Sequence, residues 1–259
     1  MAILHDALPF KTWMDPRLRR LPGILPLDPD DWLRVDEVYA AQMAERERLI
    51  AERSQAVIAA LPGSEAAVAE LYDTVSAQLP ALGFEAQSGG WHCPDGRFVS
   101  GDGAPLAVLG RLVQEDLVLM QAGPEGHHVM TAAVLCFPAS WTLSEKIGRG
   151  LPGIHTPVAI YDDSLARRVQ RLFDAVRPGQ PLWRGNVLDY TDPSLHQPRL
   201  ETEKRPHDTA RRGYIRSERQ VLLRLPQTQA VLFAIHTYIV RRDTLTAEEE
   251  AAFEARGHG

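Results

Sequence analysis

Five apolar segments in the second half of the chain constrain the fold more than any other feature. Two of them, 116–121 and 129–137, precede a connector rich in Gly and Pro, and three follow it, at 182–190, 214–225 and 230–240. They are rich in β-branched and aromatic residues and are separated by turn residues, which is typical of strands. Helical patterns fill the connector region and the first part of the chain, so we expect an α+β fold.

The order of these segments narrows the fold class further. Two strands, then short helices and connectors, then three strands is the order of the PAS fold. In that fold an antiparallel five-stranded sheet and its inserted helices clasp a ligand against one sheet face. Other α+β sheets share the order. We therefore expect a PAS-like five-stranded antiparallel sheet with inserted helices, plus an N-terminal helical layer.

The first 82 residues supply that layer. Residues 1–30 are apolar and rich in proline, which predicts an extended segment lying over the core. A helical pattern runs over 32–61, and Ser64 begins a second one that ends at Pro80. From Gly83 the pattern changes to short segments that we interpret as strands: GFEAQ, WHCPDGRFVSGDG and PLAVLGRLVQEDLVLMQ.

Three regions are expected from these changes. Residues 1–82 would form the N-terminal extended segment and helices packing on the core, 83–243 the sheet domain, and 244–259 a short C-terminal helix and tail. Thr246 and Glu249 have the spacing of a capping box at the start of that last helix.

Composition excludes several function classes. The chain has 28 basic and 34 acidic residues and a net charge of -6, which argues against nucleic acid as a partner. Its two cysteines, Cys93 and Cys136, form no CxxC pair for zinc or an iron–sulfur cluster and fit a reducing compartment. No window is long and apolar enough to cross a membrane, so we expect a cytoplasmic protein.

The connector at 141–157 is the first candidate site, because it presents His155 on an irregular segment between core elements. Imidazole is a common metal ligand. The alternative is a partly buried histidine that is hydrogen-bonded to a backbone carbonyl. The neighbouring pair His127 and His128 lies in a glycine-bounded turn and is expected to be solvated.

Several long motifs resemble the heme-dependent oxidative N-demethylase family, in particular its heme-binding alpha subunit. They are LPGILPL at 21–27, CFPASWTLSEKIGRGLPGIHTPV at 136–158, WRGNV at 183–187, LHQP at 195–198, RSERQVLLRLP at 216–226 and AVLFAIHTY at 230–238.

The resemblance implies a PAS-like domain that binds heme b and acts as an oxidoreductase. In the family, dioxygen and NADPH oxidise a small secondary amine, dimethylamine, to a primary amine and formaldehyde. FMN, a 2Fe-2S cluster, NADPH and tetrahydrofolate would be bound by partner subunits. The alternatives are a non-catalytic heme PAS gas-sensing or binding protein, and a structural domain without heme.

The resemblance also implies site residues. His155 would be the iron ligand, with His196 of LHQP as the alternative. Lys146 and Arg184 could pair with heme propionates or form ordinary salt bridges, and Asn186 of the WRGN motif would belong to the same cofactor-binding group.

The strand RSERQVL supplies candidate catalytic groups. Alternation places Glu218 and Gln220 on one face and Arg219 and Val221 on the other. We name Glu218 and Arg219 as candidates, since a donor could stabilise reduced dioxygen and a carboxylate could hold an ammonium group. Two positions depart from the family pattern. Val187 replaces a tryptophan and His236 replaces an arginine, and we expect both to border the pocket.

Overall fold

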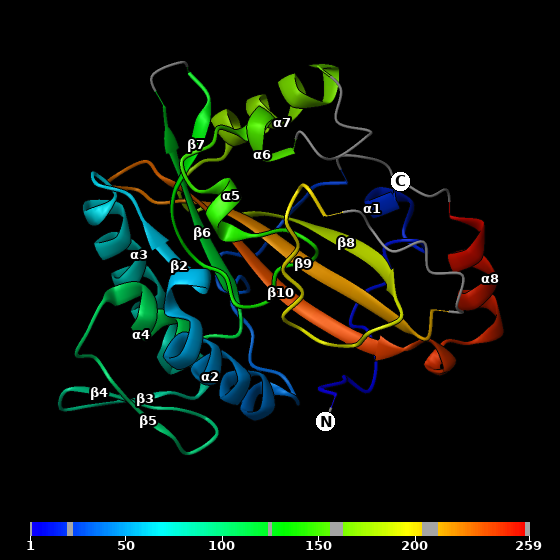
Figure 1. Cartoon of the computed structure of the whole chain (residues 1–259), viewed down its shortest axis with the longest axis horizontal. Helices are drawn as coiled ribbons and strands as arrows, with labels where there is room; N and C mark the ends of the chain where they lie inside the picture. Colours follow the sequence, from blue (N-terminus) through cyan, green and yellow to red (C-terminus); the bar gives the residue numbers. More distant parts are fainter. Residues whose placement is uncertain (1, 20–22, 124–125, 156–162, 204–211, 257–259) are drawn as a thin grey trace.

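The computed structural model describes residues 2–19, 23–123, 126–155, 163–203 and 212–256. Its centre is a seven-stranded sheet in the order β1-β8-β9-β10-β6-β7-β2, with every neighbouring pair antiparallel (Figure 1). The strands are β1 (Leu25–Pro26), β2 (Ile58–Ala60), β6 (Asp116–Ala122), β7 (His128–Val134), β8 (Leu182–Tyr190), β9 (Tyr214–Arg224) and β10 (Val231–Arg241).

The α+β class is confirmed, and all five predicted strands occur. They form the contiguous middle of the sheet, β8-β9-β10-β6-β7. The sheet is wider than the expected five strands because two short segments of the first 82 residues extend it. β1 pairs with β8 through Leu25, and β2 pairs with β7 through Ile58. Strands of two or three residues carry almost no periodicity, so the sequence pattern could not reveal them.

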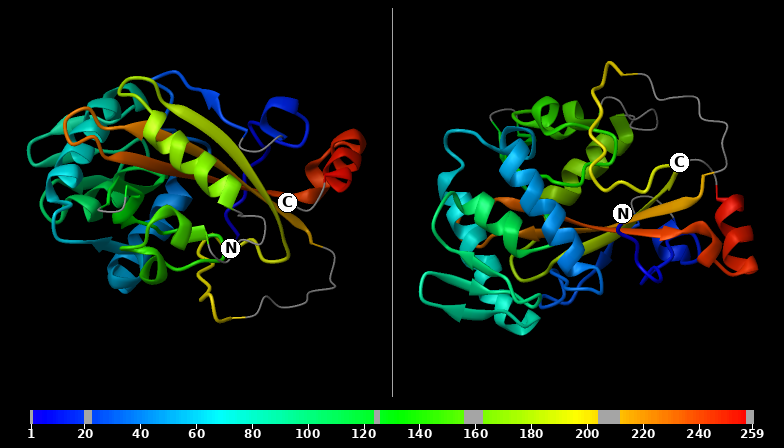
Figure 2. Two further views of the ribbon diagram at one scale, coloured as in Figure 1. Left: turned by 90° about the horizontal axis from the view of Figure 1, so that it is seen from above. Right: turned by 60° about the horizontal axis from the view of Figure 1, so that its bottom comes forward.

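The helices lie on both faces of the sheet (Figure 2). Their bounds are α1 (Pro16–Arg19), α2 (Tyr39–Val57), α3 (Glu65–Gln78), α4 (Pro105–Leu112), α5 (Leu143–Lys146), α6 (Leu151–His155), α7 (Asp163–Ala175) and α8 (Ala247–Ala255), with 3-10 turns at Leu79–Leu82 and Arg242–Thr244.

One sheet face, which we call the insertion face, is covered by α5, α6 and α7. Val118, Leu222 and Phe233 belong to the apolar cluster on this side, which Leu151 and Phe173 of the inserted helices complete. Residues directly opposite in an antiparallel pair share a face, so this cluster fixes the orientation of every side chain along β8, β9 and β10.

The opposite face, which we call the N-terminal face, carries the larger apolar core. Leu117 and Val221 point to this side, where they pack with residues of α2, α3 and α4. Toward the other end of β9 and β10, the N-terminal segment takes over, with Leu8 and Trp13 in a cluster with Ile215. The segment therefore covers the sheet as predicted.

Two helices differ from the sequence prediction. Residues 105–112, PLAVLGRL, form helix α4 and not a strand; Pro105 starts the helix, where its missing N–H costs nothing. The long helix starts at Tyr39 and not at 32, because side chains of the turn before β6 hold the preceding residues: Gln114 accepts from the N–H of Asp36 and Glu115 from that of Arg34.

A separate three-stranded sheet, β3-β4-β5, extends from the main body beside α4 (Figure 1). Its strands are β3 (Glu85–Gln87), β4 (Gly90–His92) and β5 (Phe98–Ser100). The capping box that begins α8 is present, with Thr246 and Glu249 bonded to each other's backbone N–H groups.

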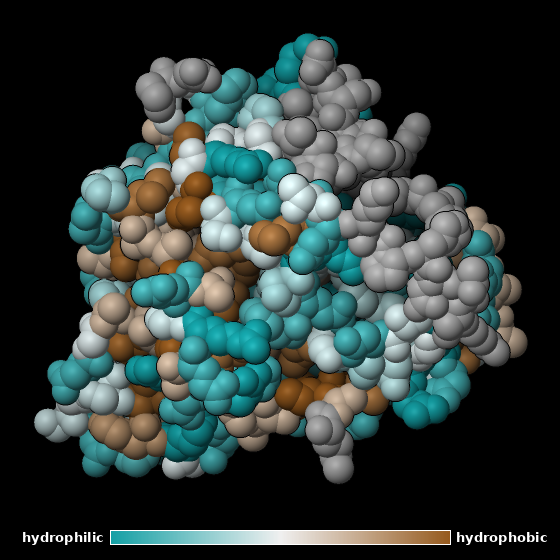
Figure 3. Space-filling model, viewed as in Figure 1, coloured by the Kyte–Doolittle hydropathy of each residue, from teal (hydrophilic) through white to brown (hydrophobic). Residues whose placement is uncertain are grey.

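The surface in the view of Figure 1 is mixed. Hydrophobic side chains show mainly in its left half, and hydrophilic ones fill much of its centre (Figure 3). Among the described helices, none has both the length and the apolar character needed to span a bilayer.

Candidate functional site

A polar cluster lies on the insertion face where β8 pairs with β9. Asn186 is opposite Glu218, and Arg184 is opposite Gln220. Since Leu182 and Leu222, on the same faces of these strands, pack against the inserted helices, all four polar side chains point to that side of the sheet. The structure therefore brings Arg184 and Asn186 together with Glu218, which lies far from them in the sequence.

The carboxylate of Glu218 is held from three directions. Gln220 Nε2 donates to Oε2 at 2.9 Å, Asn186 Nδ2 approaches the same oxygen at 3.5 Å, and Arg216 Nε donates to Oε1 at 3.3 Å. Glu218 is only 6% exposed. A buried carboxylate with this many donors is fixed in position, which suits a group that must orient a charged ligand.

Arg216 is the partner that sequence reasoning missed. It is 1% exposed, and its guanidinium donates to the carbonyl oxygens of Leu195 and Phe137 as well as to Glu218. Arg216 belongs to the RSERQ motif. The alternation of residues along a strand cannot predict that a buried arginine will donate hydrogen bonds to two carbonyl oxygens of loops distant in the sequence.

Arg184 differs from Arg216, because its Nε is fully buried and has no hydrogen-bond partner among the described residues. Burial lowers the pKa of the Arg184 guanidinium, and the nearby Glu218 carboxylate opposes this effect only in part. The residue as a whole is half-buried, but burying one N–H of a cation without a partner is costly, and an anionic group bound beside it would remove that cost.

Lys146 has found a protein partner. Its Nζ donates to Glu201 Oε1 at 2.7 Å and to the carbonyl oxygen of Ile154 at 2.6 Å. Arg149 also binds Glu201, at 2.9 Å. Lys146 is therefore engaged in the ion pair that the sequence left open as an alternative to a heme propionate.

Of the two candidate iron ligands, one can be described in full. His155 is the last residue of α6, and its side chain lies outside the described part of the structure. His196 Nδ1 is 2.8 Å from the carbonyl oxygen of Cys136. Because a carbonyl can only accept, Nδ1 carries the proton, which leaves Nε2 with the free electron pair that a metal needs.

Comparison with known families identifies the family of the chain. The model of the family described as "Haem-dependent oxidative N-demethylase, alpha subunit-like" matches residues 23–256. The chain belongs to this family. The resemblance drawn from the sequence motifs is thus confirmed. The family name specifies a heme-dependent oxidative reaction, and "alpha subunit-like" points to further subunits.

The residues on the insertion face suit the heme that the family name implies. Arg184 offers a half-buried cation to a propionate. His196, on the loop that follows β8, has its Nε2 free of a protein hydrogen bond within the described residues. Three other positions taken from the family motifs, Arg219, Val187 and His236, lie on the N-terminal face. Arg219 donates to the backbone carbonyls of Asp31 and Trp32 and lies 5.9 Å from the ring centroid of Trp183.

The two departures from the family pattern also lie on the N-terminal face. Val187 packs with the cluster around Leu8 and Trp13, and His236 pairs with Arg219 across β9 and β10. Both residues thus lie on the sheet face opposite Glu218 and Asn186, because Val187 follows Asn186 directly on β8 and His236 pairs with Arg219, the residue next to Glu218 on β9.

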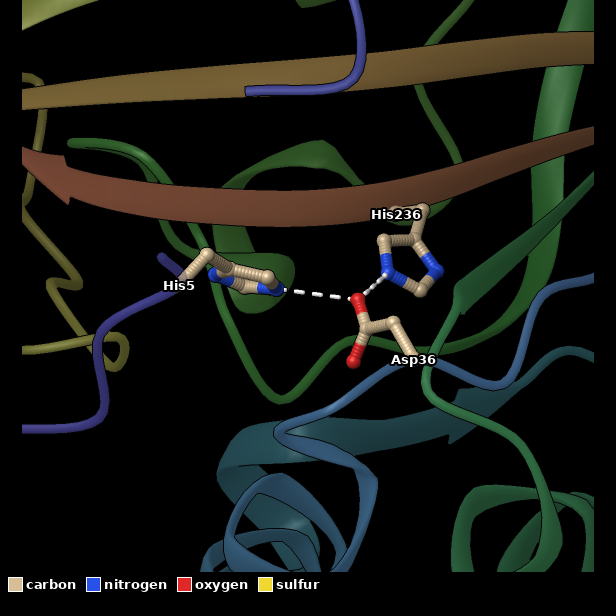
Figure 4. Close-up of side chains that lie close together, drawn as sticks. All are labelled: His5, Asp36 and His236. Carbon is tan, nitrogen blue, oxygen red and sulfur yellow. Dashed lines mark hydrogen bonds and ion pairs between the residues drawn. The ribbon is translucent and has the colours of Figure 1, made fainter. Parts of the chain in front are cut away.

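His236 belongs to a second cluster of titratable groups that the sequence did not predict (Figure 4). Asp36 Oδ2 lies 2.9 Å from His5 Nε2 and 2.9 Å from His236 Nε2. His236 Nδ1 lies 2.9 Å from Glu115 Oε1. These residues come from four separate parts of the chain, so no spacing in the sequence could have joined them.

The His5, Asp36 and His236 side chains are of types that bind metal ions. The hydrogen bonds describe a closed network of ion pairs instead. The N–H of Ile239 donates to His5 Nδ1 at 3.2 Å, so the proton of His5 is on Nε2, the atom that would have to face an ion. His236 has a carboxylate at each ring nitrogen and is therefore an imidazolium.

Proposed function

We propose that the chain is the heme-binding subunit of an oxidative amine N-demethylase. Its substrate would be dimethylamine or a related small secondary amine, oxidised with dioxygen and NADPH to a primary amine and formaldehyde. The match of the family to residues 23–256 carries this proposal. The five central strands support a PAS-like core, because the inserted helices α5 to α7 lie between the second and third of them and cover one sheet face.

Heme b would bind on the insertion face. We propose His155 as the iron ligand, from its place in the IHTPV motif at the end of α6. His196 is the alternative, supported by its free Nε2. Arg184 would pair with a propionate, whereas Lys146 would first have to leave Glu201. FMN, a 2Fe-2S cluster, NADPH and tetrahydrofolate would be bound by partner subunits.

When bound, heme supplies the iron at which dioxygen is reduced and the amine is oxidised. The chain's own contribution is to orient the amine. A secondary ammonium group carries a positive charge and two N–H donors, and Glu218 presents a fixed carboxylate beside Asn186. Arg216 and Gln220 hold that carboxylate in place, so little reorganisation is needed when the ammonium binds.

Hemin titration of the purified chain tests the cofactor and its ligand. Wild type should develop a Soret band, and His155→Ala should lose or shift it. His196→Ala is the competing variant, and His127→Ala, at an exposed loop position, is the control. A band that changes only in His196→Ala would transfer the ligand role to His196, and no band in wild type would refute heme binding.

Turnover tests the activity separately. With its reductase partner, the heme-loaded chain should couple dimethylamine oxidation to NADPH consumption and release one formaldehyde per NADPH. A bound heme with neither product would contradict the enzyme and support the non-catalytic sensor.

A further inference from the structure

The charges of the polar cluster on the insertion face do not balance. Arg184 and Arg216 contribute two positive charges, and Glu218 contributes one negative charge. Both oxygens of Glu218 already accept hydrogen bonds, and those bonds come from Arg216, Gln220 and Asn186 and none from Arg184. One positive charge is therefore left over on Arg184, a half-buried residue whose Nε is buried without a hydrogen-bond partner.

Two other side chains of this region, Gln220 and Lys146, do not neutralise Arg184. On β9 it faces Gln220, a neutral side chain whose amide donates to Glu218. The other cation first assigned to this region, Lys146, is neutralised by Glu201. Within the described residues, Arg184 forms neither a hydrogen bond nor an ion pair, and its Nε is completely shielded from water.

We infer that Arg184 is a receptor for a ligand carboxylate. A guanidinium binds a carboxylate through two parallel N–H···O bonds, and such pairs are strong where water is excluded. A phosphate-sized anion could use the same fork, but only a carboxylate is present in the groups that the proposed function brings to this face. This inference rests on the proposed function for the identity of its ligands.

Two sources could supply the carboxylate. One is a propionate of heme. The other is the substrate, which would then be a carboxylate-bearing secondary amine, such as an N-methylated amino acid, and not a plain dialkylamine. Diagonal neighbours across a strand pair have side chains roughly 7–8 Å apart at their bases. Arg184 and Glu218 are such neighbours. They could thus hold the carboxylate and the ammonium group of one small zwitterion.

The first experimental arm tests the propionate. Hemin and heme dimethyl ester, which has no carboxylates, are titrated into wild type, Arg184→Met and Arg184→Lys. If the propionate is the ligand, Arg184→Met should bind hemin about ten to a hundred times more weakly, Arg184→Lys should be intermediate, and the ester should bind all three chains equally. Arg171→Met, at an exposed position on α7, is the matched control.

The second arm tests the substrate. N-methylglycine and dimethylamine are titrated into the heme-loaded wild type and followed by the shift of the Soret band and by calorimetry. If the substrate carries the carboxylate, N-methylglycine should bind at least tenfold more tightly than dimethylamine, and Arg184→Met should abolish the difference.

The two experiments distinguish a failure of this inference from a failure of the proposed function. The inference is overturned if Arg184→Met, folded as judged by circular dichroism, binds hemin like wild type and both amines bind equally. A wild-type chain that binds no heme refutes the proposed function instead. The zwitterion arm is then repeated on the heme-free chain by calorimetry, where N-methylglycine binding that requires Arg184 supports the receptor and its absence overturns it.

Discussion

At the scale of single residues, His236 shows how a buried charge is kept. Its side chain is 1% exposed. Burial disfavours the charged form, but the carboxylates of Glu115 and Asp36 outweigh this effect and raise the pKa of His236 to about 9. Burial also acts against ionised Asp36, yet the hydrogen bonds from His236 and His5 hold the pKa of Asp36 far below its ordinary value.

The pH dependence of stability follows from the raised pKa of His236. In the unfolded chain the imidazole titrates near 6.5, so its contribution to the free energy of unfolding is complete below that pH and is lost as pH rises through about 9. The difference between a pKa of 6.5 in the unfolded chain and about 9 in the folded chain corresponds to roughly 3 kcal/mol of unfolding free energy. Urea unfolding between pH 6.5 and 9.5 should show this decrease.

His236→Gln provides the control for this experiment, because glutamine keeps a hydrogen-bonding side chain without a charge. It should be less stable at pH 6.5 and should show a much smaller decrease toward pH 9.5, where cysteine ionisation in the unfolded chain still contributes. An equal decrease in both proteins would show that His236 is not the titrating group.

At the scale of elements, Gly185 of the WRGN motif explains how the N-terminal segment reaches β8. A Cβ at this position would lie 2.2 Å from Thr12 Cγ2 and 2.8 Å from Phe10 Cε2. Glycine is needed here for close approach of two chain segments and not for an unusual backbone angle. The motif therefore has a packing role on the N-terminal face, while Arg184 and Asn186 point to the insertion face.

Gly185→Ala should loosen the N-terminal segment. The added methyl group must displace Thr12 or Phe10, at a cost of about 1–3 kcal/mol. Hydrogen exchange over residues 2–19 should become faster, and trypsin should cut earlier at Arg17. Gly213→Ala, where a Cβ would meet nothing within 4 Å, is the control and should leave both measurements unchanged. Unaltered exchange in Gly185→Ala would contradict this packing role.

At the scale of the whole molecule, Arg46 of α2 connects the N-terminal helices to the sheet. It is 0% exposed and binds Asp116 at 2.7 Å. It also donates to the carbonyl oxygens of Gly110, Gln114 and Glu115, at the end of α4 and in the turn before β6. Asp116 in turn accepts from the N–H groups that follow β7. One side chain thus joins three elements.

Arg46→Met should destabilise the fold by about 3–5 kcal/mol, because it leaves the buried Asp116 carboxylate without its cation and three carbonyl groups without their donor. Arg48→Met, two residues further along α2 in exposed ion pairs with Glu45 and Glu52, should change stability by less than about 1 kcal/mol. Thermal unfolding of the two variants would test this. Similar losses in both would contradict the role assigned to Arg46.

The sequence alone was enough to predict the five central strands, the inserted helices and the family. Apolar periodicity and turn residues are local signals, and the motifs are contiguous. It was also enough to place Glu218 and Arg219 on opposite faces, since alternation is a property of any strand.

Only the tertiary structure decided which face is which. The inserted helices pack beside Leu222 and so assign Glu218, Asn186 and Arg184 to the side where a ligand is expected. The His5–Asp36–His236 cluster and the carbonyl partners of Arg216 were equally inaccessible to pattern analysis. Hydrogen bonds between distant segments depend on strand order and register, and these are set by packing across the whole sheet and not by neighbours in the chain.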